Sequence, residues 1–298
     1  MIRFALVLSV LLALLTLSPA RARACSCSGQ GPASALTRPD QTFGLRLSER
    51  LLLGQGLYNR QGHYQAFAPG EYDRSTEYAL LMAYRLKRLE LSTLTGYGAR
   101  DVALSSAAER SAGLSDTFLR MRYEGIDEPE PWQSGIYPSL AVMATLRLPT
   151  ANGDRLFPRG LGATEFALGV SLERSFARVL RAGLFAEFAG RLPDTTLGVA
   201  RQLGPRASAE FTLAYFATPD LVLSALLSTR WEGNVSVQQR VQSGTAQRLT
   251  EIGAAISFQP WKSPLRAGFA ERYAPPLDGL SANTTASLTS EFWLGYVR

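Results

Sequence analysis

The feature that most constrains this chain is an alternation of apolar and polar residues with a period of two, which recurs from residue 42 to the C-terminus. In the stretch LRAGLFAEFAG, Leu184 and Phe188 lie on one face of an extended chain, and Arg181 and Glu187 lie on the other. Side chains of a β-strand alternate between two faces, so one face is apolar and the other carries both charges. On a helix, Arg181 and Glu187 would not share a single polar stripe. The stretch therefore predicts a β-strand.

About twelve segments of roughly 9–15 residues repeat this alternation. We expect strands at residues 43–53, 77–87, 89–97, 117–124, 136–148, 165–173, 180–190, 206–215, 221–232, 248–258, 264–273 and 286–298. The links after the second, sixth, eighth and tenth segments are short, whereas the links after odd segments are mostly longer and polar; the link at 125–135 is a long exception. Short turns on one side and long loops on the other are typical of outer-membrane barrels, whose short turns lie in the periplasm.

The N-terminus has the composition of an export signal. Arg3 supplies a positive start, FALVLSVLLALLTL an apolar core, and Ala22-Arg23-Ala24 a cleavage site before Cys25. This apolar run, about 14 residues long, is short of the roughly 20 that a permanent membrane helix needs. We expect three parts: a signal peptide at 1–24, a periplasmic tail or plug at 25–40, and a transmembrane barrel at 41–298.

Composition limits the classes of partner and cofactor that we expect. The 298 residues are 46% hydrophobic and 19% charged, with a net charge of +6. The arginines are scattered singly, without a basic cluster or a nucleic-acid module, so we expect no nucleic-acid partner. Cys25 and Cys27 are too few ligands for a metal site, and we expect no cofactor. Lipid modification of Cys25 is an alternative, although Arg23 and Ala24 make a poor lipobox.

Together these observations predict an all-β, antiparallel, up-and-down transmembrane barrel of about twelve strands in the cell outer membrane. Only helices and closed barrels satisfy backbone hydrogen bonds in hydrocarbon, so the sheet should close, with lipid on its apolar face. The alternative is a soluble β-sandwich or barrel with that face inside, but its strands would be shorter, typically 5–6 residues. Aromatic residues near segment ends would form the interfacial girdles: Tyr78, Tyr84, Tyr123, Tyr215, Trp231, Phe258, Trp293 and Tyr296.

The polar face would line the lumen with charges of both signs. The candidates are Arg46, Arg50, Arg85, Arg120, Arg122, Arg147, Glu165, Glu173, Arg181, Glu187, Arg206, Glu210, Arg230, Glu251, Arg266 and Glu291. Such a set either recognises solutes or braces the barrel through ion pairs. The near balance of signs favours bracing, because an anion-selective pore should carry a larger basic excess.

A barrel of about twelve strands is intermediate between side-chain-filled barrels and open porins. Inward Phe118, Phe185, Leu226 and Trp293 would narrow the bore, and the tail at 25–40 is long enough to enter it. We therefore expect a narrow channel or transporter for small solutes, including apolar or aromatic ones. The pore is either open or plugged by the tail. The alternative is a non-conducting barrel that anchors or displays its loops.

An enzyme is a remote alternative. Barrel hydrolases need a histidine-centred constellation. The single histidine, His63, lies in a predicted loop without a suitably placed serine on the same strand face. We expect no catalytic residues.

Three short motifs resemble a known family. Gly113-Leu114-Ser115-Asp116 precedes TFLRMRY, SLAVMATLRLPTANG spans 139–153, and Gly160-Leu161-Gly162 opens ATEFALGVSLERSF. They resemble the outer-membrane family labelled as proteins of the meta-pathway of phenol degradation, although Ser115 replaces the usual glycine and Ala151-Asn152 intervene before Gly153. The resemblance covers about residues 113–176 and implies a transporter-like barrel. Its motifs belong to turns, so it implies nothing about the cargo.

Overall fold

The computed structural model describes residues 36–37, 41–105, 107–126, 138–151, 162–176, 179–196, 199–218, 220–260 and 263–298. The expected signal peptide at 1–24 lies outside these residues, as do most of the tail at 25–40 and most of the long link at 125–135. No helix in the described part of the chain is long and apolar enough to cross a membrane.

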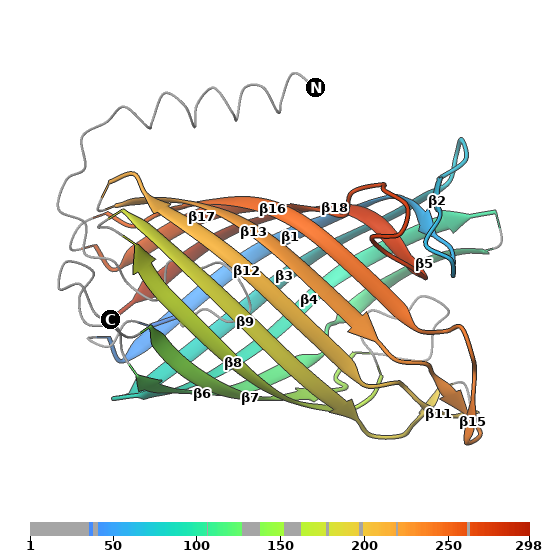
Figure 1. The fold of residues 1–298 in the computed structure, drawn as a ribbon, viewed down its shortest axis with the longest axis horizontal. Helices are drawn as coiled ribbons and strands as arrows, with labels where there is room; N and C mark the ends of the chain where they lie inside the picture. The colour runs from blue at the N-terminus through green and yellow to red at the C-terminus, as the bar shows by residue number, and fades with distance from the viewer. Residues whose placement is uncertain are drawn as a thin grey trace.

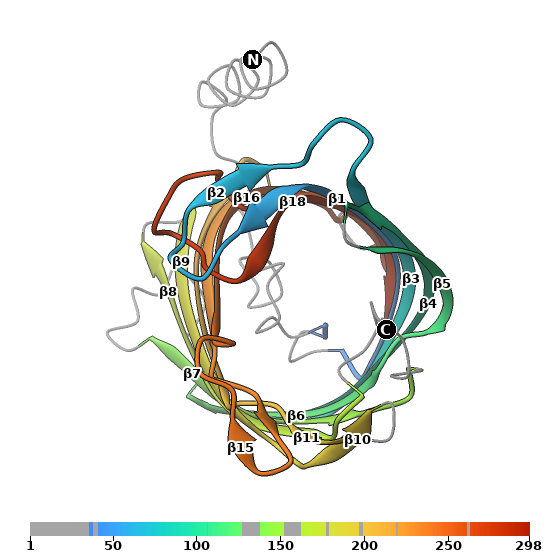
Figure 2. The same ribbon diagram turned by 90° about the vertical axis from the view of Figure 1, so that its right-hand side faces the viewer.

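Twelve long strands dominate the described residues. They are β1 (Phe43–Tyr58), β3 (Tyr72–Leu86), β4 (Leu89–Leu104), β6 (Thr117–Ile126), β7 (Ser139–Leu148), β8 (Glu165–Phe176), β9 (Leu180–Arg191), β12 (Arg206–Phe216), β13 (Leu221–Glu232), β16 (Gln247–Phe258), β17 (Leu265–Tyr273) and β18 (Thr284–Val297). Each long strand pairs antiparallel with the next, and β18 pairs with β1 to close the sheet. The ring is seen end-on in Figure 2. The all-β, up-and-down barrel expected from the sequence is confirmed.

The two ends of the barrel differ. One end, which we call the short-turn end, carries the C-terminus and tight links such as Lys87-Arg88 between β3 and β4 (Figure 1). The other, the long-loop end, carries the short strands β2 (Tyr64–Ala66), β5 (Ala107–Leu114), β10 (Asp194–Thr196), β11 (Val199–Gln202), β14 (Ser236–Val237) and β15 (Arg240–Val241). The last four form a separate sheet in the order β10-β11-β14-β15.

Several links expected to be loops therefore contain strands. The predicted loop at 100–116 is wrong: β4 runs on to Leu104, and β5 returns as its antiparallel partner. This hairpin extends beyond the register in which β4 pairs with β6, which ends at Leu94. Outside the lipid a strand needs no apolar outer face, so the sequence ARDVALSSAAERSAGL carries little of the alternation that marks the other strands.

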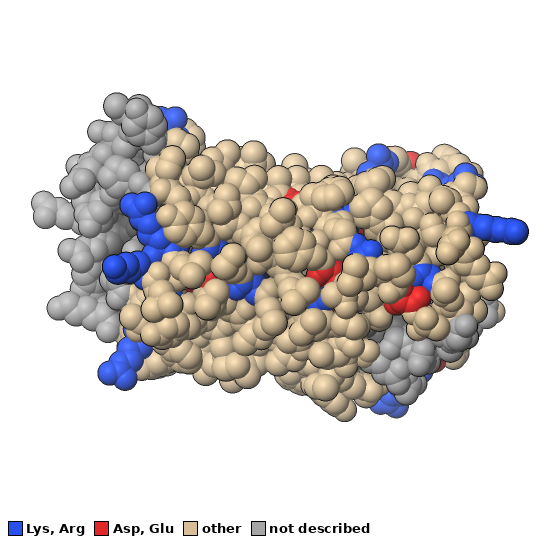
Figure 3. Space-filling view, turned by 90° about the horizontal axis from the view of Figure 1, so that it is seen from below, with Lys and Arg blue, Asp and Glu red and all other residues tan. Residues whose placement is uncertain are grey.

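The outer face of the wall is apolar. On β9, Leu184 is 49% exposed and Phe188 59%, whereas Arg181 is 7% and Phe185 4% exposed. Figure 3 shows the same property on one side of the molecule: apart from a narrow row of charged atoms, the surface between the two ends is neither basic nor acidic. Large apolar side chains outside and charges inside are the reverse of a soluble β-fold, so the apolar face of this closed sheet contacts lipid.

Most of the expected girdle residues lie on this outer face. Tyr78, Tyr84, Tyr123, Trp231 and Phe258 are all exposed. The prediction that Trp293 belongs to the girdle is wrong, because Trp293 is only 8% exposed and its ring covers Gly268 on the inside of the wall. The glycine leaves room that a Cβ atom would occupy, which is why an indole fits there. Trp293 therefore narrows the bore, the other role that its sequence position suggested.

Candidate functional site

The residues predicted to line the lumen all occupy inward-facing positions, since their strand neighbours are the exposed apolar residues. They lie on β1 (Arg46, Arg50), β3 (Arg85), β6 (Arg120, Arg122), β7 (Arg147), β8 (Glu165, Glu173), β9 (Arg181, Glu187), β12 (Arg206, Glu210), β13 (Arg230), β16 (Glu251), β17 (Arg266) and β18 (Glu291). Solute contact by these residues stays a prediction. Their contacts within the chain divide them into three clusters.

The first cluster, on β8, β9 and β12, is tightly paired. Glu165 accepts from Arg191 at 2.7 Å and from Arg206 at 2.8 Å. Arg206 also reaches Glu187 at 2.7 Å, and Arg191 reaches Glu232 at 2.8 Å. Glu165 and Arg191 are buried. Charge-assisted bonds of this length, shared among several partners, brace the wall and leave little capacity for a solute.

The second cluster lies at the short-turn end. The Arg85 guanidinium donates to Glu124 at 2.7 and 3.1 Å and lies 3.5 Å from Glu90. Arg122 lies 3.6 Å from Glu124, and Glu173 lies 3.5 Å from Arg181. These residues come from β3, β4, β6, β8 and β9, so the cluster spans almost half of the ring.

A piece of the N-terminal tail is bound to this second cluster. The backbone N–H groups of Leu36 and Thr37 donate to the Glu90 carboxylate at 3.2 and 2.9 Å, and the Thr37 hydroxyl also donates to it. Arg85 donates to the Thr37 hydroxyl and carbonyl, both at 2.9 Å. From β17, three strands around the ring from β3, Arg266 donates to the Leu36 carbonyl at 3.0 Å. Thr37 is completely buried, and Figure 2 shows this short piece inside the ring.

A glycine makes room for the same piece. A Cβ atom on Gly44 would lie 2.8 Å from Leu36 Cγ and 3.1 Å from Thr37 Cγ2. Gly44 faces inward on β1, so Leu36 packs directly on the backbone of the wall. Tail and wall are therefore complementary in shape as well as in hydrogen bonding.

The third cluster, on the wall from β12 through β18 and β1 to β3, is loosely paired. Glu291 lies 3.7 Å from Arg46 and 3.5 Å from Arg50, which lies 3.6 Å from Glu77. Arg272 lies 3.5 Å from Glu210, and the hydroxyl of Ser228 donates to Glu251 at 3.4 Å. Arg46 Nε and Trp293 Nε1 are buried without a hydrogen-bond partner among the described residues.

The remaining predicted residues have local partners. Arg120 donates to the Thr145 hydroxyl at 3.2 Å. Arg147 pairs with Asp116 at 2.8 Å, and its guanidinium lies 5.0 Å from the centre of the Phe118 ring. Arg230 lies near the long-loop end of β13, 3.4 Å from Glu232.

Sequence reasoning missed or misplaced several charged residues. Arg191 was expected to begin a loop but lies in β9 and is buried, and Asp73 with Arg100 forms a 2.8 Å pair in what were expected to be loops. Lys87, at the end of the expected strand 77–87, lies exposed in the β3–β4 turn. The signal that could have found Arg191 is its spacing, because it lies four residues after Glu187 and so on the same strand face as Arg181 and Glu187.

At the long-loop end, His63 pairs with Asp278. The ring Nδ1 lies 3.0 Å from Asp278 Oδ2, and the Tyr64 N–H donates to Asp278 Oδ1 at 2.7 Å. Hydrogen bonds from His63 and from the Tyr64 backbone hold the pKa of Asp278 below its usual range. The contact joins the β1–β3 loop to the β17–β18 loop.

Comparison with known proteins supports the fold. No protein-family model matches the chain, and no curated protein matches it. A crystal structure of an outer membrane channel from Pseudomonas putida F1 matches with a TM-score of 0.77 at 15% identity, covering 91% of this chain and 100% of the channel. The NanC porin matches with a TM-score of 0.51 at 9% identity, covering 85% of this chain and 98% of the porin.

The chain has the fold of an outer-membrane channel. Its closed wall and apolar outer face place it in the outer membrane, as the sequence predicted. The phenol-degradation family label stays a prediction, since the likeness is in fold alone. The motif that suggested it forms the junction of β5 and β6, where Ser115 donates to Glu77 and Asp116 pairs with Arg147.

Proposed function

We propose that this barrel is a narrow channel for small, moderately apolar or aromatic solutes, closed at its short-turn end by the tail segment that contains Leu36 and Thr37. The observation that carries the proposal is the binding of this segment inside the ring, by Arg85 on β3, Glu90 on β4 and Arg266 on β17. A wall that only anchored loops would need no carboxylate aimed at the backbone N–H groups of its own tail.

The chemistry of the lumen supports the solute class. Most inward charges face partners of opposite sign, so a strongly hydrated ion would have to compete with existing pairs to shed its water. Phe185, Leu226 and Trp293 are buried on the inner side and add apolar surface. A small solute with few polar groups would lose the least hydration free energy on entering such a bore.

Planar-bilayer conductance tests the proposal. Wild type should conduct weakly, and deletion of residues 25–40 should raise the single-channel conductance several-fold. Gly44→Val should do the same, because the new side chain would occupy the place of Leu36. Gly190→Val is the matched control: a Cβ atom there meets nothing within 4 Å, and the conductance should not change.

A second candidate function is a non-conducting barrel that displays its loops. The tight pairs of Glu165 with Arg191 and Arg206 favour it, since they fill one side of the lumen. Conductance separates the two functions. If neither the full chain nor the 25–40 deletion conducts above an empty bilayer, the channel is excluded and the display function stands.

We propose no enzymatic role. The contact described for the His63 ring is with Asp278, whose other carboxylate oxygen is used by the Tyr64 N–H. A histidine in that contact joins two loops. His63→Gln should leave conductance unchanged.

A further inference from the structure

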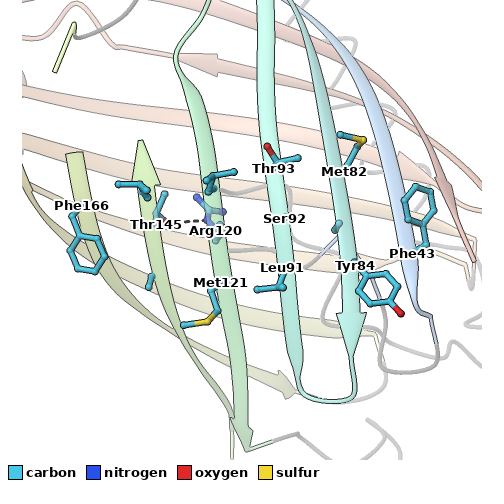
Figure 4. A pocket seen from close by; sticks show the side chains of 14 residues that line it. Phe43, Met82, Tyr84, Leu91, Ser92, Thr93, Arg120, Met121, Thr145 and Phe166 are labelled. Atoms are coloured by element: carbon cyan, nitrogen blue, oxygen red, sulfur yellow. Dashed lines mark hydrogen bonds between the residues drawn. The ribbon is translucent and has the colours of Figure 1, made fainter. Parts of the chain in front are cut away.

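A groove crosses the outer face of the wall near the short-turn end. It has a volume of about 560 Å³ and lies between two ridges of outward side chains (Figure 4). Cross-strand pairing forms the lower ridge from Phe43, Tyr84, Leu91 and Met121. The upper ridge is formed in the same way from Met82, Thr93, Leu119, Leu146 and Phe166.

The groove is largely apolar because its polar lining residues other than Thr93 turn away. Ser92, Arg120 and Thr145 lie between the ridges, but their side chains point into the barrel, where Arg120 donates to Thr145. What remains at the floor is backbone, already paired within the sheet, together with Ala144 beside Met121. Neighbouring ridges lie two residues apart along each strand, about 6–7 Å, which is wide enough for one hydrocarbon chain.

A basic turn lies directly below the lower ridge. Lys87 and Arg88 form the whole link between β3 and β4, and both are exposed. Arg88 donates to the Gly125 carbonyl at 3.3 Å, and the Lys87 ammonium has no ion-pair partner among the described residues. The turn between β12 and β13, on the other side of the ring, carries Asp220 instead.

We propose that the groove and this turn together bind one anionic phospholipid of the periplasmic leaflet. An acyl chain lies between the ridges, and the phosphate lies against Lys87 and Arg88. Lys87 lies three residues after Tyr84, about 10 Å along the chain, a length that spans the glycerol ester region. The short turns of such barrels face the periplasm, which selects the phospholipid leaflet. Basic side chains at a headgroup surface favour anionic lipids.

This inference does not depend on the proposed channel function. It rests on the outer wall alone, and a non-conducting barrel would carry the same site.

Native mass spectrometry of the full mature chain in detergent, with phosphatidylglycerol or phosphatidylcholine added, tests the proposal. Wild type should retain one phosphatidylglycerol per chain and prefer it over phosphatidylcholine by about tenfold or more. Lys87→Asn with Arg88→Gln should abolish this preference and leave residual binding of both lipids; asparagine suits the left-handed φ of 53° at Lys87.

A second variant tests the groove itself. Ala144→Phe fills it and should reduce retention of both lipids about tenfold, whereas Ala225→Phe, the same change on the outer face of β13, should not. Heat-modifiable migration on a gel verifies that each variant is folded. Equal retention of both lipids by wild type, or a preference that survives the charge variant, overturns the proposal. So does a change from dimer to monomer on Ala144→Phe, which would mean that a second copy covers the groove.

Discussion

Glu165 is the residue on which the first lumen cluster depends. It is buried and accepts from both Arg191 and Arg206, so Glu165→Gln removes one of the two carboxylate partners of each guanidinium group. We expect a loss of about 3 kcal/mol in the free energy of unfolding. Glu251→Gln is the matched control, since Glu251 accepts one 3.4 Å bond from Ser228, and it should cost less than about 1 kcal/mol. Urea titration of the heat-modifiable band measures both, and equal losses would contradict the division into tight and loose clusters.

The stability of the loop contact at Asp278 should depend on pH. The pKa of Asp278 is lowered by hydrogen bonds from His63 and Tyr64, so the loop contact is stabilising above the ordinary carboxyl pKa and is lost as the pH falls through the lower folded value. We expect the Tyr64 amide to be protected from exchange at neutral pH, and its protection factor, taken against the intrinsic rate at each pH, to fall in strong acid. In Asp278→Ala, which removes the acceptor, the protection should already be lost at neutral pH. Hydrogen exchange of Tyr64 that is unaffected by this substitution would contradict the contact.

For a single residue, sequence periodicity predicts which face of the strand the side chain lies on, but it predicts little about the residue's partner. Arg181 and Glu187 share a strand face, as their spacing predicts, but they do not pair with each other: Arg181 reaches Glu173, and Glu187 is bound by Arg206. Register between strands decides such contacts, and it depends on turn lengths that the alternation does not record. Leu36 and Thr37 show no periodicity at all, so their place in the lumen is visible only in the structure.

Among the elements, the β3–β4 hairpin has a turn that needs a residue with positive φ. Lys87 adopts a φ of 53°, a left-handed conformation that proline cannot reach. Lys87→Pro should lower the free energy of unfolding by more than about 1 kcal/mol. Lys87→Gly keeps the conformation accessible and should leave the stability nearly unchanged. A folded-band melting curve for Lys87→Pro that overlies the wild-type curve would show that the turn has another geometry.

Strand centres were predictable, whereas strand ends were not. The centres of β8, β9 and β12 lie where the alternation places them, because there one face meets hydrocarbon and the other meets charges. Beyond the lipid that contrast ends, so β5 and the continuation of β4 to Leu104 carry no comparable signal. Hydrogen bonding alone extends these strands, and it is insensitive to side-chain hydropathy.

For the whole molecule, closure follows from the need to pair every strand edge. The first and last strands, β1 and β18, pair from Gly44 with Val297 to Tyr58 with Thr284, and this pairing removes both edges of the sheet. The apolar face of the predicted strands, together with the need to satisfy backbone hydrogen bonds in hydrocarbon, predicts this closure. The sequence pattern could not predict the width of the bore, because this width depends on inward glycines. Gly268 leaves room for the Trp293 ring, and Gly44 leaves room for Leu36.

The central claim is that the apolar face of each strand contacts lipid and the charged face lines the interior. A spin-label scan of β9, with Cys25 and Cys27 replaced by serine and the barrel in bilayers, tests it most directly. Labels at 184, 186 and 188 should collide with dissolved oxygen far more often than with a water-soluble nickel complex. Labels at 183, 185 and 187 should not show this preference for oxygen. A scan with the opposite phase, or with no period of two, would contradict the claim.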